Sequence, residues 1–138
     1  METIRKPLSV VLGLMAIVVL FHFVFNPFYE DAVDAISVWH VLNWVMAVGI
    51  LITLALTYVR RGRLGADSAT TTYICVNVAF YVAVVLAILF FWNWFDDLTA
   101  GEDGQSPTRG YYWVIINVTF VVLLGTVSAR LWKNDPRA

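Results

Sequence analysis

The sequence predicts an all-α integral membrane protein in which four transmembrane helices form an up-down bundle. Three observations carry this prediction: the apolar composition, four long uncharged stretches, and the sorting of basic and acidic residues along the chain. Of the 138 residues, 60% are hydrophobic and only 14% are charged. A soluble domain of this length cannot bury so much apolar surface in its own core, so we expect lipid to cover part of it.

The stretch at residues 38–59 shows the pattern most clearly. It contains 22 residues and no Asp, Glu, Lys or Arg. At about 1.5 Å per residue, a helix of this length crosses a hydrocarbon layer of ~30 Å. Acidic residues precede the stretch, and three arginines, Arg60, Arg61 and Arg63, follow at once. Because basic residues mark the cytoplasmic end of a membrane helix, this stretch orients the whole chain.

Three further apolar stretches complete the predicted bundle. The first ends at Asn26-Pro27, because proline disfavours helical geometry in the residue before it. It is longer than the apolar part of a secretory signal and no small-residue cleavage site follows, so we interpret it as an uncleaved helix. The predicted single membrane domain covers residues 1–138, with helices at about 8–25, 38–59, 73–92 and 111–131, outer loops at 26–37 and 93–110, and an inner loop at 60–72.

Charged residues are sorted by side in this topology. Eight of the nine Lys and Arg residues fall on the side of the two termini and the inner loop, with three acids, which leaves about +5 there. Seven of the ten acids and one arginine fall on the outer side, which leaves about −6. The prediction is therefore an N-in/C-in protein with both termini in the cytoplasm, in a bacterial inner (plasma) membrane.

The same charge pattern bears on possible partners. An acidic outer surface is suited to a basic soluble partner, although outer loops that simply avoid Lys and Arg give the same pattern. Lipids and other membrane subunits are the remaining expected partners. Nucleic-acid binding is not indicated, because the basic residues are dispersed along the inner surface instead of gathered in one patch.

Small residues recur at helical spacing within the predicted spans. Helices in lipid associate through close packing of small residues and a few polar contacts. We therefore expect these positions to pack helices together, within the bundle or against a neighbouring subunit. The stripes lie at Gly49 and Thr53 in the second span, at Ala79, Ala83 and Ala87 in the third, and at Gly125 in the fourth.

One asparagine lies inside each of the last three predicted helices. Asn43, Asn77 and Asn117 are each about six residues from the helix start, so ~9 Å into the bilayer. The topology places Asn43 and Asn117 in an outer layer and Asn77 in an inner one. An amide in hydrocarbon needs a partner, and we expect interhelical hydrogen bonds of about 0.5–2 kcal/mol.

The two histidines are the main candidates for chemistry. His22 and His40 lie near the outer ends of the first two helices, and the short loop between them contains Asp34. Imidazole is the commonest metal ligand, and a carboxylate can complete or orient such a site, so these three residues form a candidate site for a metal ion or haem. The alternative is a structural role, in which each neutral histidine forms a hydrogen bond with a backbone group or with water. No His-x-x-x-His or paired-cysteine spacing strengthens the metal interpretation.

Three functions remain open at this stage. The first is a small non-catalytic accessory or structural subunit of a larger membrane complex, favoured by the size of the chain and the small-residue stripes. The alternative is a metal- or haem-binding subunit of a redox or oxygenase complex that uses His22 and His40. The third is a carrier or channel component, which the lack of charged residues in mid-span disfavours.

Overall fold

The computed structural model describes residues 2–29, 34–66, 68–99 and 107–133. Its elements are α1 (Glu2–Phe25), the short 3-10 helix η1 (Asn26–Phe28), α2 (Ala35–Gly62), α3 (Thr70–Thr99) and α4 (Pro107–Lys133). All four α-helices are long and apolar enough to cross a membrane. The prediction of an all-helical chain with four such helices is therefore confirmed.

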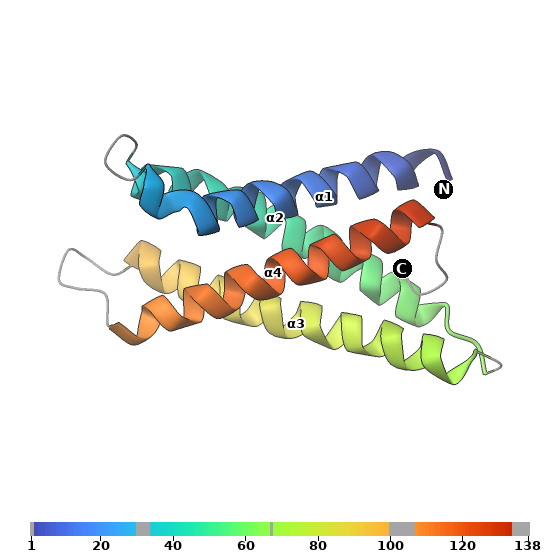
Figure 1. Ribbon diagram of the computed structural model, residues 1–138. Coiled ribbons are helices and arrows are strands. Elements are labelled where there is room, and N and C mark those ends of the chain that lie inside the picture. The colour runs from blue at the N-terminus through green and yellow to red at the C-terminus, as the bar shows by residue number, and fades with distance from the viewer. Residues whose placement is uncertain (1, 30–33, 67, 100–106, 134–138) are drawn as a thin grey trace.

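The four helices run alternately in opposite directions (Figure 1). The start of α1, the end of α4 and the connection from α2 to α3 lie at one end of the bundle, which we call the terminal end. The end of α1, the start of α2, the end of α3 and the start of α4 lie at the other end, which we call the far end. In Figure 1, α4 lies beside α3 at the far end and beside α1 at the terminal end.

Each helix extends beyond the bounds expected from apolar runs, and the predicted loops are correspondingly shorter. Residues 93–99 of the expected outer loop 93–110 continue α3, and α4 already begins at Pro107. Charge ends an apolar stretch but does not end a helix, so the acidic pair Asp96 and Asp97 lies inside the last turns of α3. Proline is favoured in the first turn of a helix, where its missing N–H costs no hydrogen bond.

The inner loop expected at 60–72 is shortened in the same way. Because α2 continues to Gly62 and α3 begins at Thr70, only residues 63–69 connect them. Most of the acidic residues that define the predicted outer surface (Glu30, Asp31, Glu102 and Asp103) lie outside the described residues.

All four helices contribute one face to a common apolar core. The fully buried side chains include Leu12 and Val19 of α1, Met46 and Ile50 of α2, Leu86 and Phe90 of α3, and Ile116, Phe120 and Leu124 of α4. Among the described elements the most extensive contact is between α1 and α4, which are the first and last helices of the chain. The first and last helices of the chain therefore pack against each other and close the bundle.

A pair of serines joins α1 to α4 near the terminal end. The Ser9 hydroxyl donates to the Ser128 carbonyl oxygen at 2.7 Å, and the Ser128 hydroxyl donates to the Ser9 carbonyl oxygen at 2.8 Å. One turn along α1, a Cβ added to Gly13 would lie only 2.9 Å from the Ser128 hydroxyl oxygen. The two backbones therefore approach closely, because glycine and serine leave room for the contact.

Gly49 has the same role for α2. A Cβ at this position would lie 3.0–3.2 Å from atoms of Met15, Phe120 and Leu124, so α2 meets α1 and α4 here. Thr53, one turn later, is fully buried. The stripe predicted on the second span thus lies against neighbouring helices of the same chain.

The other predicted stripes are divided between buried and open positions. Ala83 is buried in the core, while Ala79 and Ala87 are half-buried at its margin. Around Gly125 an added Cβ would meet no atom within 4 Å. Gly125 therefore mediates no close helix contact within the described chain.

Candidate functional site

His22 lies at the far end of the bundle, in the last turn of α1. It is 4% exposed, and its Nδ1 shares a hydrogen bond with the Tyr29 hydroxyl just after η1. The Trp39 ring from α2 packs edge-on against the imidazole, with ring centroids 4.6 Å apart. The remaining nitrogen, Nε2, is buried without a hydrogen-bond partner. His22 is therefore enclosed by aromatic side chains that connect the ends of α1 and α2.

His40 has a different environment from His22. Successive helical residues point about 100° apart, so the Trp39 ring that covers His22 leaves His40 on another face of α2. His40 is exposed, and it interacts electrostatically with the carboxyl groups of Asp34 and Asp97. The structure therefore brings Trp39, not His40, against the His22 ring.

Asp34 is the N-cap of α2. Its carboxylate accepts hydrogen bonds from the Ser37 hydroxyl at 2.6 Å and from the Ile36 backbone N–H at 3.1 Å. The Ser37 bond foremost, with the backbone bonds, holds the pKa of the Asp34 carboxyl below its ordinary value. Such capping satisfies backbone donors that the first turn of a helix leaves unpaired. The sequence contained this signal, because aspartate before an apolar helix is a frequent N-cap.

The three predicted ligands do not converge on one point: Trp39 covers the His22 ring, while His40 interacts electrostatically with Asp34. His22 is enclosed, His40 is exposed, and Asp34 caps a helix. In the part of the chain that the structure describes, no group of three or more His, Cys, Asp or Glu side chains is placed to hold a metal ion. The geometry around His22 favours hydrogen bonding and ring packing over coordination, because Nδ1 is bonded and Nε2 is covered.

The predicted membrane-depth asparagines fall into two kinds. Asn43 and Asn117 are buried, at 7% and 2% exposure, and the Asn117 side-chain oxygen has no hydrogen-bond partner. Asn77 lies towards the terminal end and is half-buried; it donates to the Tyr73 carbonyl oxygen within α3. It also accepts a hydrogen bond of 3.1 Å from the Arg61 Nε at the end of α2.

Arg61 forms a wider contact between α2 and α3. Besides Asn77, its guanidinium donates to the Tyr81 hydroxyl at 3.3 Å and lies over the Phe80 ring, 4.9 Å from the centroid. Guanidinium groups combine hydrogen bonding with ring stacking in this way. Arg61 therefore fixes the terminal end of α2 to the first half of α3.

Asn93 is a buried polar residue that the sequence analysis missed. It is 4% exposed, and its amide donates to the Leu89 carbonyl oxygen at 2.8 Å. Asn93 lies three residues after Phe90 and seven after Leu86, so it continues the buried face of α3. The helical period would have identified it if the third helix had not been ended at residue 92.

Aromatic rings join α2, α3 and α4 at the far end. The Trp113 indole N–H donates to the Asp97 carboxylate at 3.0 Å, and Trp113 also packs edge-on against Phe90. The Trp94 ring of α3 meets the Trp44 ring of α2 at a centroid distance of 4.7 Å. These contacts connect helices at the far end, as the serine pair does near the terminal end.

No family model matches the chain, and no curated protein or solved structure shows significant similarity to it. Functional inference therefore rests on the chemistry of the described residues. Around the predicted site those residues cap a helix, share hydrogen bonds and pack rings, all of which hold helix ends together.

Proposed function

We propose that this protein is a non-catalytic structural subunit of a larger membrane complex, inserted by its four helices into a bacterial inner membrane. The outward surface of the bundle supports the insertion. In the best apolar window of each helix, between 22% and 44% of the residues are buried inside the chain. The remainder is largely apolar and includes exposed Leu, Ile, Val and Phe side chains. Water does not tolerate so large a continuous apolar surface, whereas lipid does.

The distribution of charge supports cytoplasmic termini. Among the described residues the terminal end has seven basic side chains, and the far end has acids on α3 and at the cap of α2. Because Lys and Arg favour the cytoplasmic side, the terminal end is the cytoplasmic end in this proposal. The basic residues are Arg5, Lys6, Arg60, Arg61, Arg63, Arg130 and Lys133.

The observation that carries the subunit role is an open groove between α1 and α4. It has a volume of about 590 Å³, and small residues line it, including Gly13, Ala16, Gly125 and Ala129. A Cβ added to Gly125 would meet no atom of the described residues within 4 Å, and Ala129 is exposed. Small residues on an uncovered face allow a neighbouring helix to approach closely, which is how membrane helices associate. We therefore propose that this groove binds a helix from a partner subunit.

Purification from native membranes in a mild detergent tests the subunit role. We expect the protein to co-purify with other membrane subunits at a fixed ratio, and Gly125→Leu to abolish this co-purification because leucine would fill the groove. Val114→Leu is the matched control, since Val114 is exposed on α4 and does not line this groove. A native protein that migrates alone, or a Gly125→Leu variant that retains its partners, would contradict the proposal.

Cysteine labelling tests the orientation. In a Cys75→Ser background, Thr99→Cys at the far end is expected to react with a membrane-impermeant maleimide in spheroplasts. Ala66→Cys, in the connection from α2 to α3, is expected to react only after lysis. The opposite labelling pattern would show that the terminal end faces outward.

A further inference from the structure

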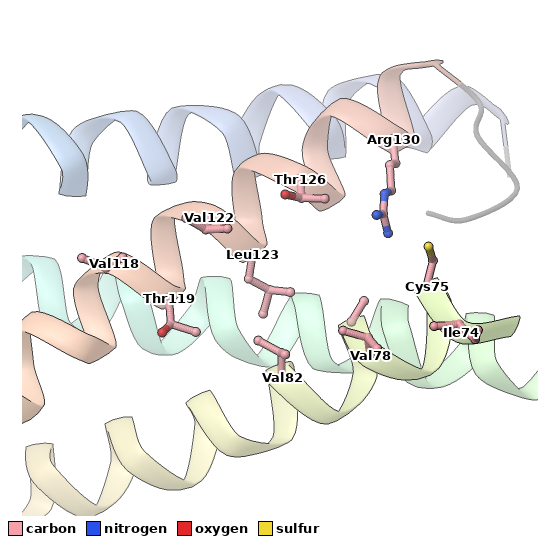
Figure 2. Close-up of a pocket in the computed structure, with 11 residues that line it drawn as sticks. Ile74, Cys75, Val78, Val82, Val118, Thr119, Val122, Leu123, Thr126 and Arg130 are labelled. Atoms are coloured by element: carbon pink, nitrogen blue, oxygen red, sulfur yellow. The ribbon is translucent and has the colours of Figure 1, made fainter. Parts of the chain in front are cut away.

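A second groove separates α3 from α4 in the half of the bundle nearer the terminal end. Its volume is about 440 Å³, within the range of about 300–1,000 Å³ that small-ligand sites occupy. The walls are apolar along most of its length, formed by Ile74, Val78 and Val82 on one side and Val118, Val122 and Leu123 on the other (Figure 2). Several of these side chains are exposed, so the groove opens sideways onto the apolar surface of the bundle.

One end of this groove is charged. Arg130, from the last turns of α4, lines the groove at the terminal end, and Figure 2 shows its guanidinium pointing towards the Cys75 thiol on α3. The groove is therefore apolar along its length and electropositive at one end.

This distribution complements an amphiphile with an apolar tail and an anionic head. We propose that the groove binds one acyl chain of an anionic phospholipid and that Arg130 binds the headgroup phosphate. The inference rests on the proposed membrane insertion but not on the subunit role, because it concerns the side of α4 away from the α1 groove. Charge complementarity favours this occupant, because an anionic phospholipid always has a phosphate to place beside Arg130. A partner helix or a second copy of the chain need not have an anionic group at that position.

Arg130 is suited to this role by its geometry. It already has an interaction within the protein, and a guanidinium presents five N–H donors, so it can bind a phosphate in addition. Arginine also matches phosphate with paired hydrogen bonds, which a lysine cannot do. The depth of the site agrees with the chemistry, because Arg130 lies near the end of α4, where headgroups meet the proposed bilayer.

The single cysteine provides a direct probe of occupancy. Cys75 is a free, half-buried thiol that lines the groove close to its charged end. A bound lipid would cover it. When phosphatidylglycerol is added to purified full-length protein in detergent, we expect Cys75 to react with N-ethylmaleimide about fivefold more slowly. The factor corresponds to the usual attraction between one basic residue and an anionic headgroup. Phosphatidylcholine, whose headgroup has no net charge, is expected to give little protection.

Variants separate the charged end from the apolar walls. Arg130→Gln is expected to weaken phosphatidylglycerol retention about fivefold in native mass spectrometry, whereas Lys133→Gln, at the same end but outside the groove, is expected to leave it unchanged. Val122→Trp is expected to abolish retention while keeping Arg130, because the indole would fill the groove. Val114→Trp is its control, since that exposed valine lies outside the groove.

Three results would overturn the proposal. If Arg130→Gln and Lys133→Gln weakened phosphatidylglycerol retention equally, the lipid would be held by general surface charge and not by Arg130. Unchanged retention in Val122→Trp would place the lipid elsewhere, and equal protection of Cys75 by both lipids would remove the role of charge. None of these results bears on co-purification with partner subunits, so a failure here is distinguishable from a failure of the subunit role.

Discussion

Helix α4 meets α1 and α3 by different means. Against α1, near the terminal end, short side chains allow close backbone approach, and the hydroxyls of Ser9 and Ser128 each donate to the carbonyl oxygen of the other residue. Against α3, at the far end, large rings fill the contact, and Trp113 donates to Asp97. A groove lies beside each of these pairs towards the terminal end, but only α1 and α4 are also joined there by the serine bonds, and their contact is the more extensive.

The comparison shows that one helix can use two kinds of contact, small polar residues against α1 and large rings against α3. A pair that meets through serine and glycine has satisfied its polar groups by reciprocal bonds and keeps its axes close. A pair that meets through tryptophan and phenylalanine fills its contact with ring volume. Helix α4 is therefore joined to α1 by hydrogen bonds to backbone carbonyls and to α3 by ring packing and an indole hydrogen bond.

The largest expected effect comes from breaking the close side of the comparison with Gly13→Leu. The Cβ would lie 2.9 Å from the Ser128 hydroxyl oxygen, which is itself held by its bond to Ser9, so the helices must separate. We expect a loss of about 3 kcal/mol in the free energy of unfolding, measured by denaturant titration in mixed micelles. Gly125→Leu, in open space on α4, is expected to change it by less than about 0.5 kcal/mol. Similar losses in both variants would show that the close contact is not specific to Gly13.

A second prediction concerns α3, where one alanine is buried and its neighbour lines the groove. Ala83→Leu is expected to destabilise the bundle by about 2 kcal/mol, because Ala83 is 1% exposed and its surroundings are already filled. Ala79→Leu would extend into the groove between α3 and α4 and is expected to cost less than about 0.5 kcal/mol. The same mixed-micelle titration measures both variants, and the reverse order would place the packed face of α3 on the Ala79 side.

The serine pair is expected to have a smaller effect, about 1 kcal/mol for Ser9→Ala or for Ser128→Ala, as is usual for hydrogen bonds between membrane helices. Because the two hydroxyls bond each other's backbone, the losses should not add independently. A double-mutant cycle measures the coupling, and strictly additive losses would show that the two bonds do not depend on each other.

The smallest expected effect is on the α3 side, from Trp113→Phe. This change keeps a ring against Phe90 but removes the 3.0 Å hydrogen bond to Asp97. We expect a loss of about 0.6 kcal/mol, the average for such bonds in a membrane protein. Because the variant lacks the Trp113 fluorophore, unfolding is followed by circular dichroism during the denaturant titration. A loss as large as that of Gly13→Leu would mean that the hydrogen bond, not ring volume, holds this side together.

The sequence was sufficient to predict four long apolar helices, because long uncharged runs are visible in the composition of each stretch. It made the helices too short, because apolar runs stop where charge begins and helices do not. Small-residue spacing identified Gly49 and Ala83, which lie at close contacts, but the same spacing selected Gly125, which has none within the described chain. Spacing along one helix identifies a smooth face but does not identify the neighbour that covers it.

The candidate site was harder to predict for a related reason. Depth in the bundle placed His22 and His40 at the same level, but the rotation of α2 decides which side chain meets α1, and this is Trp39. The contact between Ser9 and Ser128 depends on two helices at opposite ends of the chain, so no local pattern reveals it. Asn93 was the one omission that the helical period itself would have corrected.

The serine contact also has a consequence for the order of events during synthesis. It joins positions 119 residues apart, so α1 leaves the ribosome long before its main partner exists. At about 5–20 residues per second, roughly 6–24 s separate the two serines. During that interval α2 and α3 are completed first, and Arg61 can already fix their shared end. A nascent chain arrested before α4 would leave the Ser9 face of α1 without its main partner helix.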